Sequence, residues 1–162
     1  MLLSICIPTY NRVNQLDNCL NSILISKKRV ENFNFEVCIS DNNSQQRIES
    51  LIEKYKNKLN IKFNKNIKNL GFALNGIKSV EMASGTYSWM IGDDDLILPS
   101  TLTQLKEILE NNTDVDYFFI NSYHLHSKFL KRFSSPFDTK NLDFSDMKTI
   151  SKKKINRKCD FW

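Results

Sequence analysis

Short apolar segments alternate with amphipathic segments along the first 120 residues, and this alternation limits the fold more than any other feature of the sequence. The apolar segments are typical of buried strands, and we expect strands at 2–7, 35–40, 61–63, 86–91 and 115–120. After each of the first four strands, apolar residues recur at helical spacing, which predicts a helix. Strands that alternate with helices predict an α/β fold with a mostly parallel sheet and helices on both faces.

Three details of this pattern make it specific. Pro8 follows the first apolar run, and we expect the first strand to stop there. The third helix is predicted from the apolar residues Phe72, Leu74, Ile77 and Val80. Pro99 suits the first turn of the fourth helix, because proline needs no hydrogen-bond partner there.

The composition is typical of one globular domain. The chain has 162 residues, of which 41% are hydrophobic and 25% are charged, as in soluble folded proteins. No run approaches the roughly 18 uncharged apolar residues of a membrane-spanning helix. The amino-terminal MLLSICIP is expected to be a strand and not a signal peptide. The four cysteines have no CxxC spacing, which is typical of buried thiols in a reducing compartment, so we expect a cytoplasmic protein.

Positive charge is concentrated in the last part of the chain. Residues 127–158 contain ten Lys or Arg and three Asp, whereas the whole chain has a net charge of +5. We therefore divide the sequence into a core, 1–126, and a basic, partly irregular tail, 127–162. Such a tail suggests contact with something anionic: a membrane surface, nucleic acid or an acidic partner. A solvated tail without a partner stays an alternative. No known nucleic-acid-binding module supports the second of these partners, so peripheral contact with an anionic membrane is expected and nucleic acid is not.

Polar residues follow three of the predicted strands at the point where each strand ends. They are Thr9-Tyr10-Asn11, Asp41-Asn42-Asn43 and Asp93-Asp94-Asp95. Right-handed crossovers bring the carboxyl ends of parallel strands to one edge, where ligands bind in open α/β sheets. Asp41 is therefore a candidate acceptor for a nucleobase N–H, or it stabilises only its own turn. The glycine of Asn69-Leu70-Gly71 either lies close to a ligand or adopts a positive φ.

Three adjacent carboxylates, Asp93, Asp94 and Asp95, follow a buried strand directly. Their mutual repulsion calls for a positive charge, and a hard divalent cation with oxygen ligands is the simplest candidate. Asp93 and Asp95 are expected to share one face of the turn and hold the cation, Mg²⁺ or Mn²⁺, together with a diphosphate. The alternative is an acidic loop without a ligand.

Several other kinds of site have no support in the sequence. The chain has neither GxGxxG after its first strand nor GxxxxGK[ST], which argues against a dinucleotide-binding domain and a P-loop NTPase. It shows no Ser-His-Asp arrangement or nucleophile elbow. His124 and His126 have no obvious partner for a metal site, so surface or half-buried histidines are expected.

Four segments together resemble the family 2 glycosyltransferases. They are SICIPTYNR, VCISDNNS, NLGF and ASGTYSWMIGDDD, and their order and spacing match over roughly residues 3–120. The resemblance implies the GT-A fold, which is Rossmann-like, a nucleotide-diphosphate sugar donor and a divalent metal. It also implies inverting transfer, by one direct displacement at the anomeric carbon, to a glycan or lipid-linked acceptor in the making of a bacterial polysaccharide.

The resemblance also implies roles for single residues. Pro8, Thr9 and Tyr10 would line the base and ribose, and Arg12 lies in the same segment. Asp41 would contact the base, and Asn69 to Gly71 would border the nucleotide. Asp93 and Asp94 would approach the ribose and phosphate, and Asp95, the last residue of a DxD-type motif, would hold the metal.

One functional group that the resemblance implies has no match. The family uses an Asp or Glu after the DxD-type motif as general base, and none of the later aspartates has a comparable context; these are Asp138, Asp143, Asp146 and Asp160. Family members usually continue beyond this length, so the tail is also interpreted as the start of a truncated acceptor region. Donor binding is better supported than catalysis, and a non-catalytic nucleotide-binding remnant or partner-binding domain stays an alternative. A nucleotidyltransferase is a third reading, but the glycine-rich loop expected of one is missing.

Overall fold

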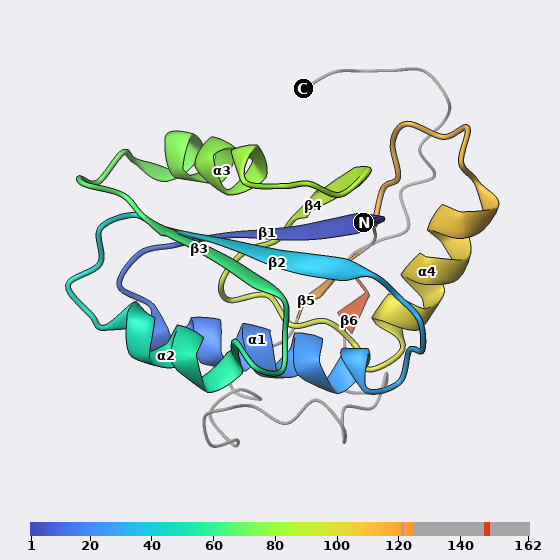
Figure 1. The fold of residues 1–162 in the computed structure, drawn as a ribbon, viewed down its shortest axis with the longest axis horizontal. Coiled ribbons are helices and arrows are strands. Elements are labelled where there is room, and N and C mark those ends of the chain that lie inside the picture. Colours follow the sequence, from blue (N-terminus) through green and yellow to red (C-terminus); the bar gives the residue numbers. More distant parts are fainter. Residues whose placement is uncertain (121, 125–147, 150–162) are drawn as a thin grey trace.

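The structure is a computed structural model and describes residues 1–120, 122–124 and 148–149 (Figure 1). The elements, in chain order, are β1 (Leu3–Thr9), α1 (Val13–Lys27), β2 (Phe35–Asp41), α2 (Ile48–Tyr55), β3 (Ile61–Lys65), α3 (Phe72–Glu81), β4 (Tyr87–Met90), α4 (Thr101–Asn111), β5 (Tyr123–His124) and β6 (Lys148–Thr149). The first four strands form one sheet in the order β3-β2-β1-β4, and β5 pairs with β6 in an antiparallel ladder.

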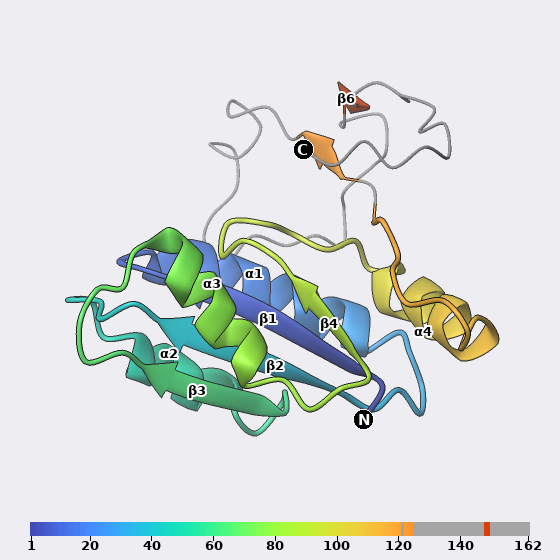
Figure 2. The ribbon, with the colours of Figure 1, turned by 90° about the horizontal axis from the view of Figure 1, so that it is seen from above.

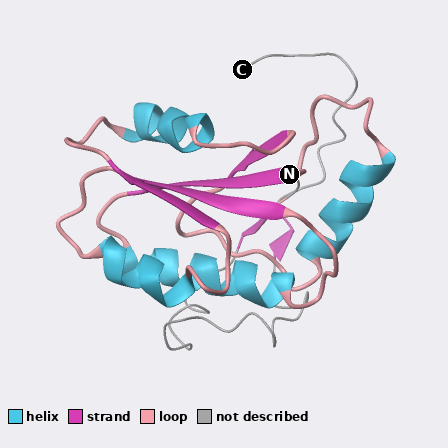
Figure 3. Ribbon diagram, viewed as in Figure 1, coloured by secondary structure: helices cyan, strands magenta, loops and turns pink. Residues whose placement is uncertain are grey.

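The predicted α/β fold with a parallel sheet is confirmed. All three strand pairs of the four-stranded sheet are parallel. Figures 1 and 3 show α3 on one face of the sheet and α1 and α2 on the other, and Figure 2 shows α4 beside the β4 end. In the register of β1 with β2, Thr9 lies opposite Asp41, so the polar segments after these two strands begin at the same level.

β1 does not stop at Pro8, as predicted, but continues to Thr9. On the side of β4, the Cys6 carbonyl accepts a hydrogen bond of 3.0 Å from the Ile91 N–H. Residues two apart on a strand direct their N–H groups to the same side, so the N–H that Pro8 lacks would also point there. Since β4 has already ended at Met90, the proline removes no hydrogen bond from the sheet.

The two faces of the sheet differ in chemistry. Apart from Thr9 and Asp41 at the strand ends, the odd-numbered residues of β1 and β2 are apolar. They join a core with α1, α2 and α4, in which Leu16, Ile52 and Leu102 take part. The even-numbered residues point to the side of α3, because successive side chains of a strand alternate between the faces. Several of them are small or polar, and all of these are buried: Ser4, Cys6, Glu36, Cys38 and Ser40. The apolar core therefore lies almost wholly on the side of α1 and α2.

Helix α3 buries its polar side and exposes its apolar side, the reverse of an ordinary amphipathic helix. The residues from which it was predicted are exposed: Phe72 by 84%, Leu74 by 55%, Ile77 by 54% and Val80 by 38%. Its buried residues are instead Asn75, Gly76 and Ser79. Small and polar residues suit this interface because the facing side of the sheet is itself small and polar. The spacing thus predicted the helix correctly, while its apolar side faces outward.

Residues 115–120 do not form the predicted fifth strand of the sheet. The Tyr87 hydroxyl donates a 2.9 Å hydrogen bond to the Val115 carbonyl, and the rings of Tyr87 and Phe118 meet edge to face at 5.6 Å. The segment therefore packs beside β4 through side chains. Its β-branched and aromatic residues fit a half-buried surface, and that preference alone does not produce a hydrogen-bonded ladder.

The fourth helix also begins later than predicted. Its N-cap is Ser100, so Pro99 precedes the helix instead of lying in its first turn. The Pro99 carbonyl accepts a 3.2 Å hydrogen bond from the Ser26 hydroxyl of α1, which fixes the entry into the helix. The division at residue 126 stays a prediction, since most of the proposed tail lies outside the described residues.

A buried carboxylate ties the loop after α3 to the opposite, amino-terminal end of the sheet. Glu36 Oε1 accepts hydrogen bonds from the Ser4 hydroxyl at 2.7 Å and the Ser84 N–H at 2.7 Å. Its Oε2 lies 3.0 Å from Lys62 Nζ. Burial by itself raises the pKa of Glu36, but these hydrogen bonds outweigh it and lower the pKa to about 2.

Candidate functional site

A cleft of about 370 Å³ opens at the carboxyl edge of the sheet. It is bordered by the loops after β1, β2 and β4 and by the start of α3. Its lining residues are Pro8, Thr9, Tyr10, Arg12, Asn42, Asn69, Gly71, Phe72, Asn75, Gly92, Asp93 and Asp94. A hollow of about 520 Å³ near the amino-terminal end of β2 is lined by Lys27, Val30, Asn32, Phe33 and Asn34, and it has no carboxylate. The cleft at the carboxyl edge is therefore the candidate site.

Asp93 joins the end of β1 to the loop after β4. Its Oδ2 accepts a 2.8 Å hydrogen bond from the Thr9 hydroxyl, and its Oδ1 lies 3.2 Å from Arg12 Nη1. The same Nη1 lies 3.0 Å from Asp94 Oδ2. Burial raises the pKa of Asp93, although the Thr9 hydrogen bond and the Arg12 charge act in the other direction. Both carboxylates raise the pKa of Arg12.

Arg12 changes the interpretation of the three aspartates. From the sequence, we expected a positive charge beside the aspartates to offset their repulsion. The Arg12 guanidinium supplies such a charge from within the chain. The pair that shares this partner is Asp93 and Asp94, whereas Asp93 and Asp95 were expected to act together. Asp95 is exposed and turns back on its own loop, where its Oδ2 accepts a 2.8 Å hydrogen bond from the Gly92 N–H.

The side chains of Asp94 and Asp95 both lie close to the backbone of Gly92. A Cβ added to Gly92 would lie 2.8 Å from Asp94 Oδ1 and 3.1 Å from Asp95 Oδ2, so two carboxylate oxygens from neighbouring residues converge on one point. Carboxylate oxygens are the ligands that Mg²⁺ and Mn²⁺ prefer. Among the described residues, no group of three or more His, Cys, Asp or Glu is arranged to hold a metal. These two carboxylates alone would not complete a cation's coordination, so a cation here would need further ligands from water and a bound phosphate.

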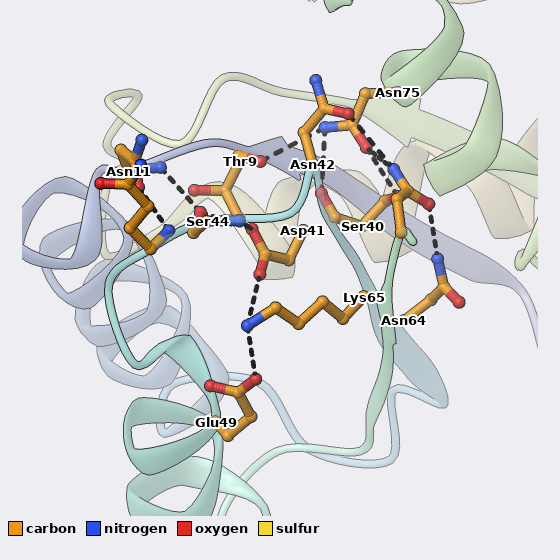
Figure 4. A network of polar contacts seen from close by, with 12 residues as sticks. Thr9, Asn11, Ser40, Asp41, Asn42, Ser44, Glu49, Asn64, Lys65 and Asn75 are labelled. Atoms are coloured by element: carbon orange, nitrogen blue, oxygen red, sulfur yellow. Dashed lines mark hydrogen bonds and ion pairs between the residues drawn. The ribbon is translucent and has the colours of Figure 1, made fainter. Parts of the chain in front are cut away.

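Asp41 is buried and does not line the cleft. Its Oδ1 accepts hydrogen bonds from the Ser44 N–H at 3.0 Å and the Ser44 hydroxyl at 2.5 Å, which is the turn role considered for it (Figure 4). Its Oδ2 is buried without a hydrogen bond. The nearest cation to that oxygen is Lys65 Nζ at 3.9 Å, which lies closer to Glu49 Oε1, at 2.9 Å.

Asn42 and Asn69 together shape the wall of the cleft after β2. Asn42 Nδ2 donates to Asn69 Oδ1 at 2.8 Å, and Asn42 Oδ1 accepts from the Leu70 N–H at 2.7 Å. Asn69 Oδ1 also accepts from the Gly71 N–H at 2.8 Å. Gly71 has a φ of +81°, a conformation that a side chain would strain. Asn69 and Gly71 both line the cleft, and their contact with a nucleotide stays a prediction.

Asn75 is a cleft residue that the sequence reasoning missed. It is only 3% exposed and connects α3 to β1, to β2 and to the residue that follows β3 (Figure 4). Its Oδ1 accepts from Ser40 Oγ and from Asn66 Nδ2, both at 2.8 Å, and its Nδ2 donates to the Ser40 carbonyl at 3.0 Å and the Thr9 carbonyl at 3.3 Å. The only signal in the sequence was an amide at a helical position among apolar residues.

The remaining predicted features are outside the cleft or outside the described part of the chain. Asp138, Asp143, Asp146 and Asp160 lie beyond the described residues, as does His126. No helix in the part of the chain that the structure describes is long and apolar enough to cross a membrane. Cys6, Cys19 and Cys38 are free buried thiols, as expected.

Comparison with known proteins extends this picture. The sequence profile of the family described as "Glycosyl transferase family 2" matches residues 4–160. The chain is 40% identical over 117 residues to the abequosyltransferase RfbV of Salmonella typhimurium, which covers 71% of this chain and 34% of that protein. It thus spans about a third of that relative's length.

Solved structures resemble the same part of the chain. TarS of S. aureus, residues 1–349, has been solved with UDP and with UDP-GlcNAc. The UDP complex matches this chain with a TM-score of 0.62 and 27% identity, and the match covers 70% of this chain and 33% of that one. A mannosyltransferase of Pyrobaculum calidifontis, solved with GDP-Man and Mn²⁺, matches with a TM-score of 0.50 and 18% identity over 58% of this chain and 28% of that one. The second likeness concerns the fold alone.

Proposed function

Because this chain belongs to glycosyl transferase family 2, we propose that its cleft binds a nucleotide-diphosphate sugar and that the protein transfers the sugar to an acceptor. The observation that carries the proposal is the meeting of Thr9, Arg12, Asp93 and Asp94 at the carboxyl edge of the sheet. This is where ligands bind in open α/β folds, and TarS, with 27% identity, has been solved with UDP-GlcNAc.

The nucleotide is proposed to occupy the part of the cleft between β1 and α3. Pro8, Thr9 and Tyr10 form one wall for the base and ribose, and Asn69 and Gly71 form the other. The carboxylate of Asp41 is proposed to accept a hydrogen bond from the base, since its Oδ2 is buried without a hydrogen bond. Binding at that oxygen requires a local rearrangement, because Asp41 is fully buried.

The diphosphate and a divalent cation, Mg²⁺ or Mn²⁺, are proposed to lie over Gly92. Asp95 would hold the cation together with Asp93, as the resemblance to a DxD-type motif implies, and Asp94, whose Oδ1 also lies near Gly92, would add a further ligand. When bound, the cation would neutralise charge that develops on the leaving nucleoside diphosphate. Arg12 holds Asp93 and Asp94 in place and brings a permanent positive charge to the same edge.

The transfer is proposed to proceed by inversion, with the acceptor hydroxyl attacking the anomeric carbon in one displacement. The chain's own contribution is to orient the donor and to keep Asp93 fixed through Thr9 and Arg12. The acceptor is proposed to be a glycan or lipid-linked glycan of a bacterial polysaccharide. The protein is proposed to work in the cytoplasm, peripherally at the inner face of the membrane, without nucleic acid as a partner.

One observation favours a second candidate, a nucleotide-binding domain without catalysis. Apart from Asp93 and Asp94, which Arg12 holds, no carboxylate among the described residues lines the cleft, so none is placed there as general base. The two candidates share donor binding and differ in sugar transfer to an added acceptor.

Titration calorimetry tests the shared step. UDP, GDP, CDP and dTDP are titrated with Mn²⁺ and with a chelator, into the parent chain, Asp95→Ala and Asp114→Ala. Asp114 is an exposed carboxylate that does not line the cleft, so its variant is the matched control. We expect one nucleotide to bind, at least about tenfold more weakly in chelator or with Asp95→Ala, because each removes a charge-assisted contact. Binding that is equal in chelator would exclude the metal, and failure of every nucleotide to bind would refute the proposal.

A further inference from the structure

Helix α3 leaves an apolar surface uncovered beside the cleft. Leu74, Ile77 and Val80 lie on its outward side, and Phe72 projects from its first turn at the cleft. In the loop that leads into α3, Ile67 is 99% exposed. A helix of a folded domain usually buries its apolar side, so an outward apolar side is typical of a surface that meets another apolar phase. We call Leu74, Ile77 and Val80 the α3 patch.

The segment that carries the α3 patch has a positive net charge in the sequence. Residues 61–81 contain four Lys and one Glu, a net charge of +3, whereas residues 1–126 as a whole contain thirteen Lys or Arg and fourteen Asp or Glu. Three of these lysines are paired with a carboxylate: Lys62 with Glu36, Lys65 with Glu49 and Lys78 with Glu81. Lys68, in the loop before α3, has no ion-pair partner among the described residues. An apolar helix side with an unpaired lysine in the adjoining loop is the pattern of a segment that lies in an anionic membrane interface.

From this geometry we infer that α3 and the loop before it form the surface with which the protein docks on an anionic lipid membrane. The inference rests on the proposed function in one respect, because it names the surface for the proposed membrane contact. A second copy of the chain is a poorer occupant, since a stable interface takes about 20–30 residues from each partner and the patch offers few. No helix among the described residues is long and apolar enough to cross a membrane.

Docking through α3 places the cleft at the membrane surface. Phe72 belongs to the cleft and to the first turn of the same helix, so the mouth of the site opens next to the docking surface. An acceptor carried on a lipid would then reach the cleft by moving within the membrane plane. The patch thus serves to present the acceptor side of the site to lipid.

Vesicle flotation of the full chain tests the inference. Phosphatidylcholine vesicles are compared with vesicles that also contain a quarter phosphatidylglycerol, at low and high salt. The double variant Leu74→Ser/Ile77→Ser removes the centre of the patch, and Ile108→Ser, an apolar residue 43% exposed on α4, is its control. Lys68→Glu reverses the local charge, and Lys28→Glu, at another exposed lysine, is the control for charge.

We expect binding only to the anionic vesicles, weaker at high salt, and reduced about tenfold or more by the double variant. Lys68→Glu should reduce it about fivefold or more, and both controls should stay within about twofold of the parent. The inference would be overturned if the double variant and Lys68→Glu both bound the vesicles as strongly as the parent. A dimer in sedimentation velocity that the double variant abolishes would also overturn it. Nucleotide titrations of the same proteins separate the two proposals: nucleotide binding without vesicle binding refutes only the docking surface, and the reverse refutes only the proposed function.

Discussion

Replacing Asn75 by alanine should be among the most damaging single changes to this domain. The side chain makes four hydrogen bonds, and through them α3 is joined to the ends of β1, β2 and β3. Removing them leaves the Ser40 hydroxyl buried without its acceptor. The other partners are less affected, because the Thr9 carbonyl keeps the Asn42 N–H at 2.9 Å and Asn66 Nδ2 keeps Asn42 Oδ1 at 3.4 Å.

The expected loss follows from this inventory. Each lost hydrogen bond is worth about 1 kcal/mol, and an orphaned buried hydroxyl costs about 1–3 kcal/mol. Since two of the partners stay satisfied, we expect the free energy of unfolding to fall by about 3–4 kcal/mol. That is a large part of the roughly 5–15 kcal/mol that stabilises a typical domain.

Urea unfolding followed by circular dichroism measures the loss. With a slope of about 2 kcal/mol per molar urea, the midpoint should fall by roughly 1.5–2 M. Asn64→Ala is the control, because the Asn64 side chain is half-buried and donates one hydrogen bond, to Asn66 at 2.9 Å; it should lower the free energy of unfolding by less than about 1 kcal/mol. Equal urea midpoints for the two variants would refute the conclusion that the Asn75 side chain anchors α3 to the sheet.

Three further predictions concern acid stability, the base contact and close packing. The pKa of Glu36 is about 2 in the folded state and about 4.3 in the unfolded chain. The stabilising effect of its carboxylate is therefore complete above about pH 4.5 and is lost as the pH falls towards 2. Over that window the melting temperature of Glu36→Gln should decline less than that of the parent. Asp41→Asn should weaken nucleotide binding by about 1.5–3 kcal/mol in calorimetry, whereas a lower melting temperature with unchanged affinity would leave Asp41 only its turn role. Gly85→Ala would place a Cβ 2.7 Å from the Ser4 N and 2.8 Å from the Leu3 carbonyl carbon, so it should cost about 3 kcal/mol or more in urea unfolding; Gly76→Ala, which meets only the flexible Met90 sulfur at 3.3 Å, should cost less.

The sequence specified the order of elements well because each element carries its own periodic signal. The four parallel strands and the four helices lie close to where apolar spacing predicted them. Boundaries were less certain, and Pro8 shows the physical reason. Whether a missing N–H disrupts a strand depends on the length of its neighbour, which local sequence does not contain.

The orientation of α3 and the partner of the aspartates were not predictable in the same way. Apolar residues at helical spacing show that a helix forms, but its direction of packing depends on the face it meets. Here that face presents Ser4, Glu36 and Ser40. Likewise, Arg12 lies 81 residues before Asp93 in the chain, and only the sheet brings them to 3.2 Å. The resemblance to a known family pointed to both residues without indicating that they form an ion pair.

The unequal chemistry of the two sheet faces has a consequence for how the native domain fluctuates. α3 is attached through amide, hydroxyl and glycine contacts, whereas α1, α2 and α4 are attached by buried apolar side chains. Detaching α3 would therefore expose little new hydrocarbon, so this opening should carry a small heat-capacity change and respond weakly to denaturant. Native-state hydrogen exchange should show α3 amides exchanging through a sub-global opening nearly independent of urea, while β1 and α1 exchange only when the whole domain unfolds. The wall of the cleft that α3 supplies would thus open and close as one unit against a rigid remainder.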